Sequence, residues 1–500
     1  MAALPFKESP AASSACISAS RRFIQACKKY VRAFFRGTCL TKRVYDIPKG
    51  CDFMSELFIS GGVVIDPEKG EAYPADVLVR EGVIAAIGDL TAPEGAAVID
   101  AAGRYVCPGF IDPHGHIDGH LYTGELSLLQ GITTTVGGNC GFSPLDLEKF
   151  FAEQKAFPIH QAEMIGMCAL RVAAGVVDPF QAASEEQVDR MAQLCEKALQ
   201  DGACGVSLGP AYTPGSSILE MQTLCAIAKR YEKPVSIDTR MNSMTDLDSL
   251  QEAIDLAAHS GCRMIVSHFV YQYGVGVEDE AMAMVDRARG MGVDVVFDSG
   301  MYKDWCSSIG AALFEPGIMR ANGIELHHLR MITGEHMGVV PDEPLYMHLR
   351  EQHPNDAVVV NTGSQRAVYA IARNPLCMVS TDTGAYEPGE GHPQIAGSFP
   401  RFLREMVRDR AELSWLEAIA HMTLWPAQVL GFDKKGRMQP GCDADLVILD
   451  PKTLCDHADF PGLGQPNAAP DGIEYVIVAG EIAAQNAKAT GAMAGRALKN

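Results

Sequence analysis

The sequence lacks both a long apolar run and a surplus of positive charge. It has no stretch of about 18 consecutive apolar residues, the length that a membrane-spanning helix needs. Acidic residues outnumber basic ones, 62 against 42, and the formal net charge is −20. Because nucleic acids and anionic membranes bind clustered basic surface, this balance argues against both. We therefore expect no membrane span and no nucleic-acid partner.

A repeating cysteine spacing and chain-wide repeats are also missing. The 15 cysteines are scattered, which is typical of reduced thiols in a cytoplasmic protein and not of a disulfide framework. Hydrophobic residues make up 47% and charged residues 21% of the chain, as in ordered globular proteins. The 500 residues exceed one ordinary core, so we expect one large domain with a small companion.

Residues 1–53 differ in charge from the rest of the chain. They carry ten Lys/Arg and three Asp/Glu, so the remaining residues hold a net charge of −27. Residues 21–35 could form a basic amphipathic helix for a membrane surface or for targeting. Met54 begins a stretch that reads like the start of a domain. That start favours the alternative, a basic N-terminal extension without structure that arises from an upstream start site.

Short strand patterns at both ends of the remaining chain are expected to form one small β domain. They lie between residues 57 and 100, at 444–450 and at 473–480. Between them, apolar strands alternate with helical patterns, which predicts parallel βα units. The clearest helical patterns are 183–201, 219–232, 245–260 and 278–291.

These patterns divide the chain at four expected boundaries. The last 18 residues are Ala-rich and polar, so we expect them to be loose. The expected parts are the extension 1–53, the β domain 54–109 plus 430–482, the central domain 110–429 and the tail 483–500.

The most informative motif is a pair of histidines one residue apart. His114 and His116 follow the apolar run 108–111, which reads as a strand. In an extended strand residues i and i+2 point to the same side, so both imidazoles could meet one metal ion. Imidazole suits zinc and neighbouring divalent ions. Two solvated loop histidines would give the same pattern, so the pair alone leaves both interpretations open.

Four further polar residues lie where a predicted strand ends. Cys140 follows the strand 133–136, and its thiolate could bind or bridge metal ions. Asp238, His268 and Asp382 end three later strands. Each alone would more often be a core residue or a helix cap. Together they supply the N, O and S ligands and the proton-handling carboxylate that a metal-dependent hydrolase needs.

Several short motifs match one enzyme superfamily. They are Pro108-Gly109-Phe110-Ile111-Asp112 before His114-x-His116, Asn139-Cys140-Gly141, Gly397-Ser398-Phe399-Pro400-Arg401 and Gly441-x-Asp443-Ala444-Asp445. Through them the chain from about Leu57 to about Gly480 resembles the amidohydrolase superfamily and, within it, the N-acyl-D-amino-acid deacylases, or D-aminoacylases.

The resemblance implies a fold, a metal and a reaction. The fold is α/β, a (β/α)8 TIM-type barrel with a small flanking β-sandwich domain built from both chain ends. A tightly bound zinc would lie beside a second, weaker divalent ion, with His114, His116, Cys140 and His268 as matching ligands. Asp382 matches an aspartate that touches metal and acts as general base. The enzyme would then be a zinc-dependent amidohydrolase of non-peptide C–N bonds, expected to cleave a linear amide in a small-molecule substrate.

Three positions depart from the family pattern. Relatives place a histidine ligand where this chain has Asp238. A carboxylate oxygen also binds zinc, so Asp238 remains an expected ligand. Gln394 replaces an arginine that grips the substrate's carboxylate, and Val270 replaces a second basic residue.

Four residues are expected to bind substrate. Tyr302 matches a family tyrosine near the substrate, and His392 precedes Gln394 in a matching motif. Arg240 is the basic residue that could still reach the pocket. Without the two missing charges, free N-acyl amino acids should be poor substrates, and a neutral amide, ester or ureide should be preferred.

Two other functions remain as alternatives. A cyclic amidase of the hydantoinase or dihydroorotase type would carry a bridging lysine at the end of the strand 204–209, where no lysine occurs. A catalytically degenerate barrel acting as a binder or scaffold is favoured by Asp238 and Gln394. Zinc content separates the scaffold from the enzymes.

Deleting residues 1–53 should leave the melting temperature and any activity unchanged within error, because the segment differs in charge from the body and precedes a domain-like start. Thermal unfolding of the full chain and of a chain starting at Met54 tests this. A fall of several degrees would instead show that the segment docks on the body.

Overall fold

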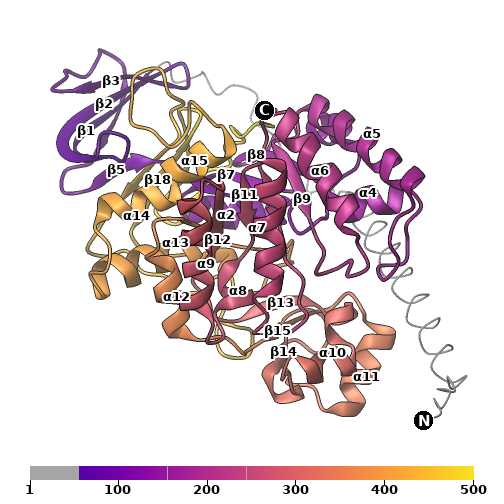
Figure 1. The fold of residues 1–500 in the computed structure, drawn as a ribbon. Coiled ribbons are helices and arrows are strands. Elements are labelled where there is room, and N and C mark those ends of the chain that lie inside the picture. Colours follow the sequence, from indigo (N-terminus) through magenta and orange to yellow (C-terminus); the bar gives the residue numbers. More distant parts are fainter. Residues whose placement is uncertain (1–55, 155, 244) are drawn as a thin grey trace, which may run out of the picture.

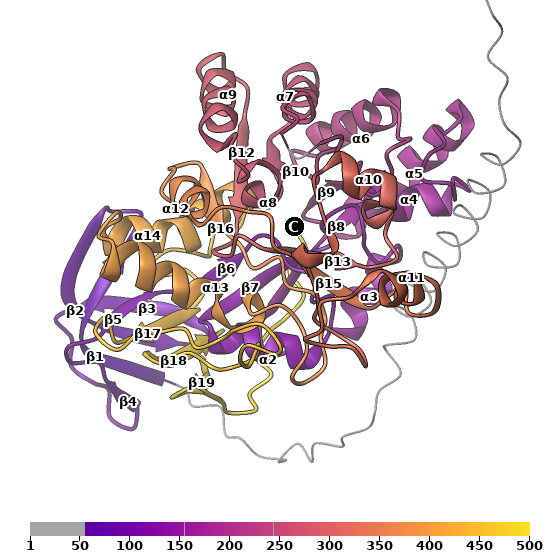
Figure 2. The same ribbon diagram turned by 90° about the horizontal axis from the view of Figure 1, so that it is seen from below.

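The computed structural model describes residues 56–154, 156–243 and 245–500, so the expectation for residues 1–53 lies outside the described part of the chain. Eight parallel strands form the centre, in the order β16-β12-β11-β10-β9-β8-β7-β6 (Figures 1 and 2). A parallel bridge between Gly115 and Thr383 joins the two ends of this order. There His116 N–H donates to the Thr383 carbonyl and Asp382 N–H to the His114 carbonyl, both at 2.8 Å. The expected TIM-type barrel is confirmed.

The barrel strands are short and buried. β7 reads Ile-Thr-Thr-Thr-Val-Gly, a β-branched sequence suited to a strand with both faces covered. The eight strands are β6 (Phe110–Asp112), β7 (Ile132–Gly137), β8 (His160–Gly166), β9 (Gly205–Leu208), β10 (Val235–Ile237), β11 (Met264–Val266), β12 (Val295–Ser299) and β16 (Cys377–Val379).

Helices cover the outside of the barrel, and the four predicted ones are confirmed to within three residues at each end. The longest, α5, begins after Ser184, which forms a capping box with Gln187, and it ends at Gly202 with a φ of 113°. The helices are α2 (Leu121–Leu129), α3 (Leu147–Glu153), α4 (Met167–Ala173), α5 (Glu185–Asp201), α6 (Ile218–Arg230), α7 (Asp248–Ser260), α8 (Phe269–Tyr273), α9 (Glu278–Gly290), α12 (Gln365–Ala372), α13 (Gln394–Phe402), α14 (Trp415–Met422) and α15 (Leu424–Leu430). Among the described residues, no helix is long and apolar enough to cross a membrane.

A separate nine-stranded sheet joins both chain ends, which confirms the companion domain. Its order is β20-β19-β18-β17-β5-β1-β2-β3, with β4 paired to β1. β17 from the late chain pairs with β5 on one side and β18 on the other, so the early and late strands form two blocks that meet at the β5–β17 pair. The strands are β1 (Glu56–Asp66), β2 (Glu71–Arg80), β3 (Val83–Gly88), β4 (Ala97–Asp100), β5 (Tyr105–Pro108), β17 (Leu446–Leu449), β18 (Ile473–Val478), β19 (Glu481–Gln485) and β20 (Lys488–Ala489).

The structure departs from the loose tail expected at 483–500. β19 and β20 extend the sheet through Ala489. Beyond them the backbone N–H of Arg496 donates to His160 Nδ1, at 3.2 Å, and that of Leu498 donates to the Gln161 carbonyl, at 2.7 Å. These backbone hydrogen bonds fix the tail against β8. The Ala-rich composition of the tail gave no sign of these backbone hydrogen bonds, because they do not depend on its side chains.

A small insertion between β12 and β16 was not anticipated within the range expected for the barrel. Three antiparallel strands form a sheet in the order β13-β15-β14. Because β13 follows soon after β12, this insertion begins beside the carboxyl ends of the barrel strands. Its elements are β13 (Trp305–Ser308), α10 (Pro316–Ala321), β14 (Leu329–Met331), α11 (Glu343–Gln352) and β15 (Ala357–Val360).

A buried charge cluster ties the barrel to the companion sheet. Asp445, directly before β17, accepts from Lys435 Nζ at 2.5 Å and from the Ala479 N–H at 2.8 Å. His160 Nε2 on β8 lies 3.0 Å from the same carboxylate. Burial opposes the charge, but His160 and Lys435 outweigh it and hold the pKa of Asp445 well below its usual range. This cluster gives a physical reason for the Gly-x-Asp-Ala-Asp motif.

Asp445→Ala should lower the free energy of unfolding by about 3–5 kcal/mol, because it leaves the buried Lys435 ammonium without this partner. Urea unfolding followed by circular dichroism measures the change. Lys197→Ala, which removes an exposed ion pair with Asp201, is the control and should cost about 0.5 kcal/mol or less. Equal effects of the two substitutions would contradict the assigned role of Asp445.

Candidate metal centre

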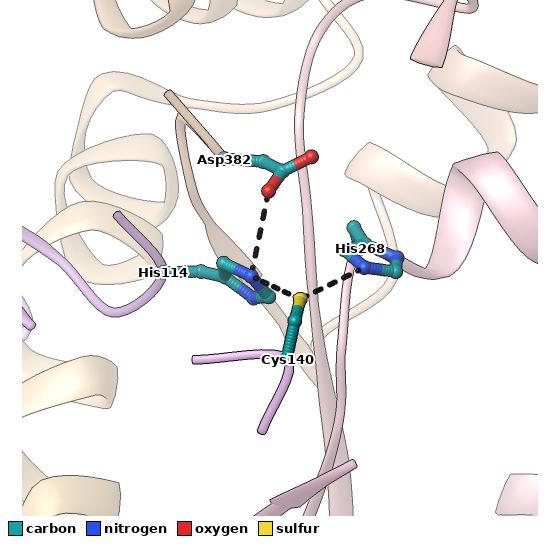
Figure 3. Close-up of side chains that lie close together, drawn as sticks. All are labelled: His114, Cys140, His268 and Asp382. Atoms are coloured by element: carbon teal, nitrogen blue, oxygen red, sulfur yellow. Dashed lines mark hydrogen bonds and ion pairs between the residues drawn. The ribbon is translucent and has the colours of Figure 1, made fainter. Parts of the chain in front are cut away.

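Four side chains that follow four different barrel strands meet in one group (Figure 3). His114, Cys140, His268 and Asp382 each offer one atom, and these atoms lie within 4.8 Å of one another. Cys140 Sγ lies 3.3 Å from His114 Nε2 and 3.5 Å from His268 Nε2. His114 Nε2 lies 3.5 Å from Asp382 Oδ1. The structure therefore brings together four of the six ligands expected from the sequence.

The backbone is left-handed at three of these four residues. Cys140, His268 and Asp382 have φ angles of 53°, 34° and 51°, a region that residues with a Cβ rarely occupy. Each lies two or three residues after its strand ends. Such a conformation costs about 1–3 kcal/mol and collects at functional sites. Here it ends the extended backbone and accompanies the convergence of the side chains.

The other two expected ligands flank this group. His116 Nε2 lies 3.4 Å from Asp382 Oδ1, and Asp238 Oδ2 lies 3.6 Å from His268 Nε2. Gln272 Nε2 donates to Asp238 Oδ1 at 2.5 Å, which leaves Oδ2 facing His268. Since Cys140 Sγ contacts both His114 and His268, it lies between two adjoining sets of donors. This arrangement could hold one ion or two that share the thiolate.

Asp298 on β12 orients two of the ligands. Its Oδ2 lies 3.3 Å from His114 Nδ1, while its Oδ1 accepts from the His268 N–H at 3.1 Å and from the Ser380 hydroxyl at 2.7 Å. A carboxylate on Nδ1 leaves Nε2 available to a metal, as is usual behind metal-bound histidines. Asp298 was not expected from the sequence, although its place at the end of the strand pattern Val-Val-Phe-Asp was a usable signal.

Asp112 holds the loop that carries Asp382. It accepts from the Thr381 N–H at 3.0 Å and from the Thr381 hydroxyl at 2.6 Å. Burial raises the pKa of Asp112 to about 7, against the lowering effect of these hydrogen bonds. The final residue of the first recognised motif therefore joins β6 to the loop after β16.

The donor set fits a zinc ion. Zinc takes thiolate, imidazole and carboxylate ligands at about 2.0–2.3 Å, so ligand atoms around one tetrahedral ion lie roughly 3.3–3.8 Å apart. Three separations, Cys140 to His114, Cys140 to His268 and His114 to Asp382, are 3.3–3.5 Å, and all four ligand atoms lie within 4.8 Å of one another. The side chains are buried or nearly so, and burying acidic donors together is costly unless a cation accompanies them.

The pKa values of the ligands reflect this shortage of positive charge. Burial lowers the pKa of His268, but the Asp238 carboxylate outweighs it and raises the value to about 9. Burial would raise the pKa of Asp382, yet the hydrogen bond from His116 and nearby histidine charges lower it to about 2. Burial and the surrounding carboxylates raise the pKa of the Cys140 thiol well above its usual range. A bound metal cation would offset the negative charge of these carboxylates in place of the protons on the histidines.

The Arg240 guanidinium is already bound to other groups of the protein. Its Nε lies 2.8 Å from Glu252 Oε2, and its other nitrogens donate to the carbonyls of Pro214 and Ser216 at 2.6 and 2.7 Å. Each nitrogen of the guanidinium thus has a partner. Contact between Arg240 and substrate stays a prediction, and it would require these bonds to break.

The other three expected substrate residues also have internal partners. Gln394 accepts from the Tyr271 hydroxyl at 2.9 Å and donates to the Asp382 carbonyl. His392 Nε2 lies 3.0 Å from the Asp304 carbonyl, and burial lowers the His392 pKa to about 3. The Tyr302 ring packs edge-on against His392, with centroids 5.1 Å apart. Gln394 thus contacts the Asp382 backbone, whereas a substrate role for all three stays a prediction.

Two tyrosines beside the centre were not expected from the sequence. The Tyr271 ring lies 5.7 Å from that of His268. The Tyr212 hydroxyl lies 3.3 Å from Ser307 Oγ on β13. Burial raises the pKa of both phenols well above the usual value, and the charge of Asp382 adds to it in each. No local motif marks either tyrosine, because folding alone brings them to the site.

Comparisons with known proteins agree with this geometry. The model of the amidohydrolase family matches residues 105–483. The chain is 32% identical over 468 residues to N-acyl-D-glutamate deacylase of Alcaligenes xylosoxydans xylosoxydans, covering 85% of this chain and 93% of that protein. L-hydantoinase of Paenarthrobacter aurescens is more distant, with 25% identity over 414 residues that cover 75% and 82%.

Solved structures of deacylases have the same fold. A structure of N-acyl-D-glutamate deacylase from Bordetella bronchiseptica, complexed with zinc and a phosphonate mimic of the tetrahedral intermediate, has a TM-score of 0.78 and 28% identity. A D-aminoacylase structure with a binuclear metal centre has a TM-score of 0.79 and 27% identity. Each match covers 89% of this chain and 99% of the other.

His114→Ala and Cys140→Ala should each lower the zinc content of the purified protein, because each removes a donor from the group. Elemental analysis after zinc-supplemented expression measures the loss. Cys377→Ala is the matched control, since Cys377 is another buried thiol on a barrel strand but lies outside the group. Unchanged zinc in the first two variants, or equal loss in all three, would contradict the assignment.

Proposed function

The chain belongs to the amidohydrolase family, and from this we propose that it hydrolyses a linear amide in a small-molecule substrate, as an N-acyl-D-amino-acid deacylase does. The observation that carries the proposal is the convergence of His114, Cys140, His268 and Asp382 within 4.8 Å. It occurs in a fold that deacylase structures match over 89% of the chain.

The residues assigned to the metal are His114, Cys140 and His268, with His116, Asp238 and Asp382 beside them. Zinc held there would activate water and polarise the amide carbonyl. Asp298 would keep the Nε2 of His114 directed at the ion by engaging Nδ1. The second, weaker divalent ion is proposed to use the donors on the other side of Cys140.

Asp382 is proposed as the general base and acid. An aspartate with an ordinary pKa is already charged near neutral pH, so this carboxylate can accept the proton of the attacking water. It would then pass that proton to the departing amine nitrogen. Gln394 and Asp112 position Asp382, because Gln394 bonds its carbonyl and Asp112 bonds the preceding Thr381.

The fold favours a linear amidase over the cyclic-amidase alternative. β9 ends at Leu208 and is followed by Gly209, so no lysine stands where hydantoinases carry a bridging one. A release assay across N-acyl-D-amino acids, N-acyl-L-amino acids, neutral amides and cyclic ureides, run on zinc-loaded protein, tests the proposal. Ring opening without release of amine from any acyclic amide would overturn it. A protein that takes up no zinc would support the scaffold.

The cytoplasm is the proposed location. No disulfide joins the described cysteines, Cys107 to Cys455, which is the state expected in a reducing compartment. Fluorescence microscopy of the tagged full chain tests this, and a signal confined to an organelle would contradict it.

Asp382→Asn should lower kcat by roughly three or more orders of magnitude, because an amide cannot accept the water proton. Zinc content should stay close to the wild-type level, since most donors remain. Stopped assays with the best substrate from the panel, together with elemental analysis, measure both. Asp279→Asn, at an exposed carboxylate, is the control for a change of charge alone. Near-full turnover by Asp382→Asn would rule out this mechanism.

A further inference from the structure

We propose that the substrate is uncharged at the end of its amine portion, and that this end lies beside Gln394. The inference rests on the proposed linear-amide hydrolysis and narrows its substrate class. It predicts an N-acyl amide, ester or ureide in preference to a free N-acyl amino acid. Two observations support it. The cationic side chains around the centre already have partners within the protein, and the other charged groups of the centre are acidic.

Cationic side chains on the loops around the centre are already paired. Arg240, two residues after Asp238, is held by Glu252 and two carbonyls. Lys303, which follows Tyr302, binds the side chain of Asn361 and lies 3.4 Å from Asp304 Oδ1. A substrate carboxylate would have to break these contacts to gain a cationic partner.

Arg401 on α13 is also engaged. Its guanidinium lies 4.5 Å from the centre of the Tyr302 ring, and its Nε lies 3.1 Å from Glu405 Oε1. The planar guanidinium is the group best suited to grip a carboxylate with two hydrogen bonds. The guanidinium groups of Arg240 and Arg401 instead bind acidic side chains of the same chain.

The backbone N–H groups of the first two residues of α13 are already engaged. The Gln394 N–H donates to His392 Nδ1 at 3.2 Å, and the Ile395 N–H donates to the His392 carbonyl at 3.1 Å. The Gln394 side-chain amide donates to the Asp382 carbonyl, and its oxygen accepts from the Tyr271 hydroxyl. Because that amide touches the Asp382 backbone, position 394 lies next to the proposed base.

The fixed charges of the centre are acidic. Asp238, Asp298 and Asp382 surround the histidines, and Cys140 would bind a metal as a thiolate. These negative charges would match the charge of one zinc ion before any substrate binds. A substrate carboxylate would add a like charge and lose its hydration without gaining a cation. An amide or ester end of the same shape would avoid both costs.

The test compares N-acetyl-D-methioninamide with N-acetyl-D-methionine, two molecules that differ in this one charge. Release of acetate by the zinc-loaded full chain is measured for each. We expect kcat/KM for the amide to exceed that for the acid by about tenfold or more. This is the least effect expected from burying one charge without a partner. Equal or faster hydrolysis of the acid would overturn the inference and leave the proposed function intact.

A binding measurement separates failure of the inference from failure of the function. Calorimetric titration of zinc-loaded Asp382→Asn should show binding of the amide about tenfold or more tighter than the acid. If neither compound is hydrolysed, deacylation of this substrate class fails, while these affinities still decide the charge preference. Equal or tighter binding of the acid contradicts it.

Gln394→Arg should shift the ratio of the two kcat/KM values towards the acid by about tenfold, because it supplies the absent charge. Gln394→Met is the matched control, since it removes the same hydrogen bonds without adding charge and should leave the ratio unchanged. A zinc-containing Gln394→Arg protein with the wild-type ratio would show that the substrate's end does not lie beside residue 394. If Gln394→Arg fails to fold, the wild-type comparison still decides the charge preference.

Discussion

The metal centre depends on one backbone constraint, the left-handed conformation of Cys140, His268 and Asp382. An extended strand would carry these side chains past one another, whereas a turn directly after each strand lets them converge. At about 1–3 kcal/mol per residue, the conformation needs contacts that offset it. The Asp298 carboxylate and the hydrogen bond from Asp382 N–H to the His114 carbonyl supply such contacts. The contacts that close the barrel therefore also hold the metal-binding side chains in place.

Two buried aspartates show how partners decide the role of a carboxylate. Asp445 has Lys435, His160 and a backbone N–H around it, so its charge is compensated within the protein. In the part of the chain that the structure describes, Oδ1 of Asp382 lies beside His114 and His116, which are themselves directed at the same small space. The first residue is suited to holding two domains together. The second retains the capacity to bind a cation and exchange a proton.

Strand-end residues were predictable from sequence because the parallel βα pattern brings carboxyl ends of neighbouring strands together. His114, Cys140, His268 and Asp382 each come two or three residues after a barrel strand ends, so their convergence follows from the barrel. Tyr212, Tyr271 and the insertion after β12 could not be found this way, because their positions depend on loop paths. The partners of Arg240 and Gln394 were hidden for the same reason, since Glu252 and Tyr271 carry no local signal.

The placement of the last residues has a consequence for the order of events during synthesis. Arg496 and Leu498 donate backbone hydrogen bonds to His160 and Gln161 on β8, the third barrel strand along the chain. Translation proceeds at about 5–20 residues per second, and domains generally fold as units. These bonds cannot form until residues 496 and 498 have left the ribosome. Nascent chains that stall before residue 496 would therefore lack them, and His160 Nδ1 and the Gln161 carbonyl would be without these two donors.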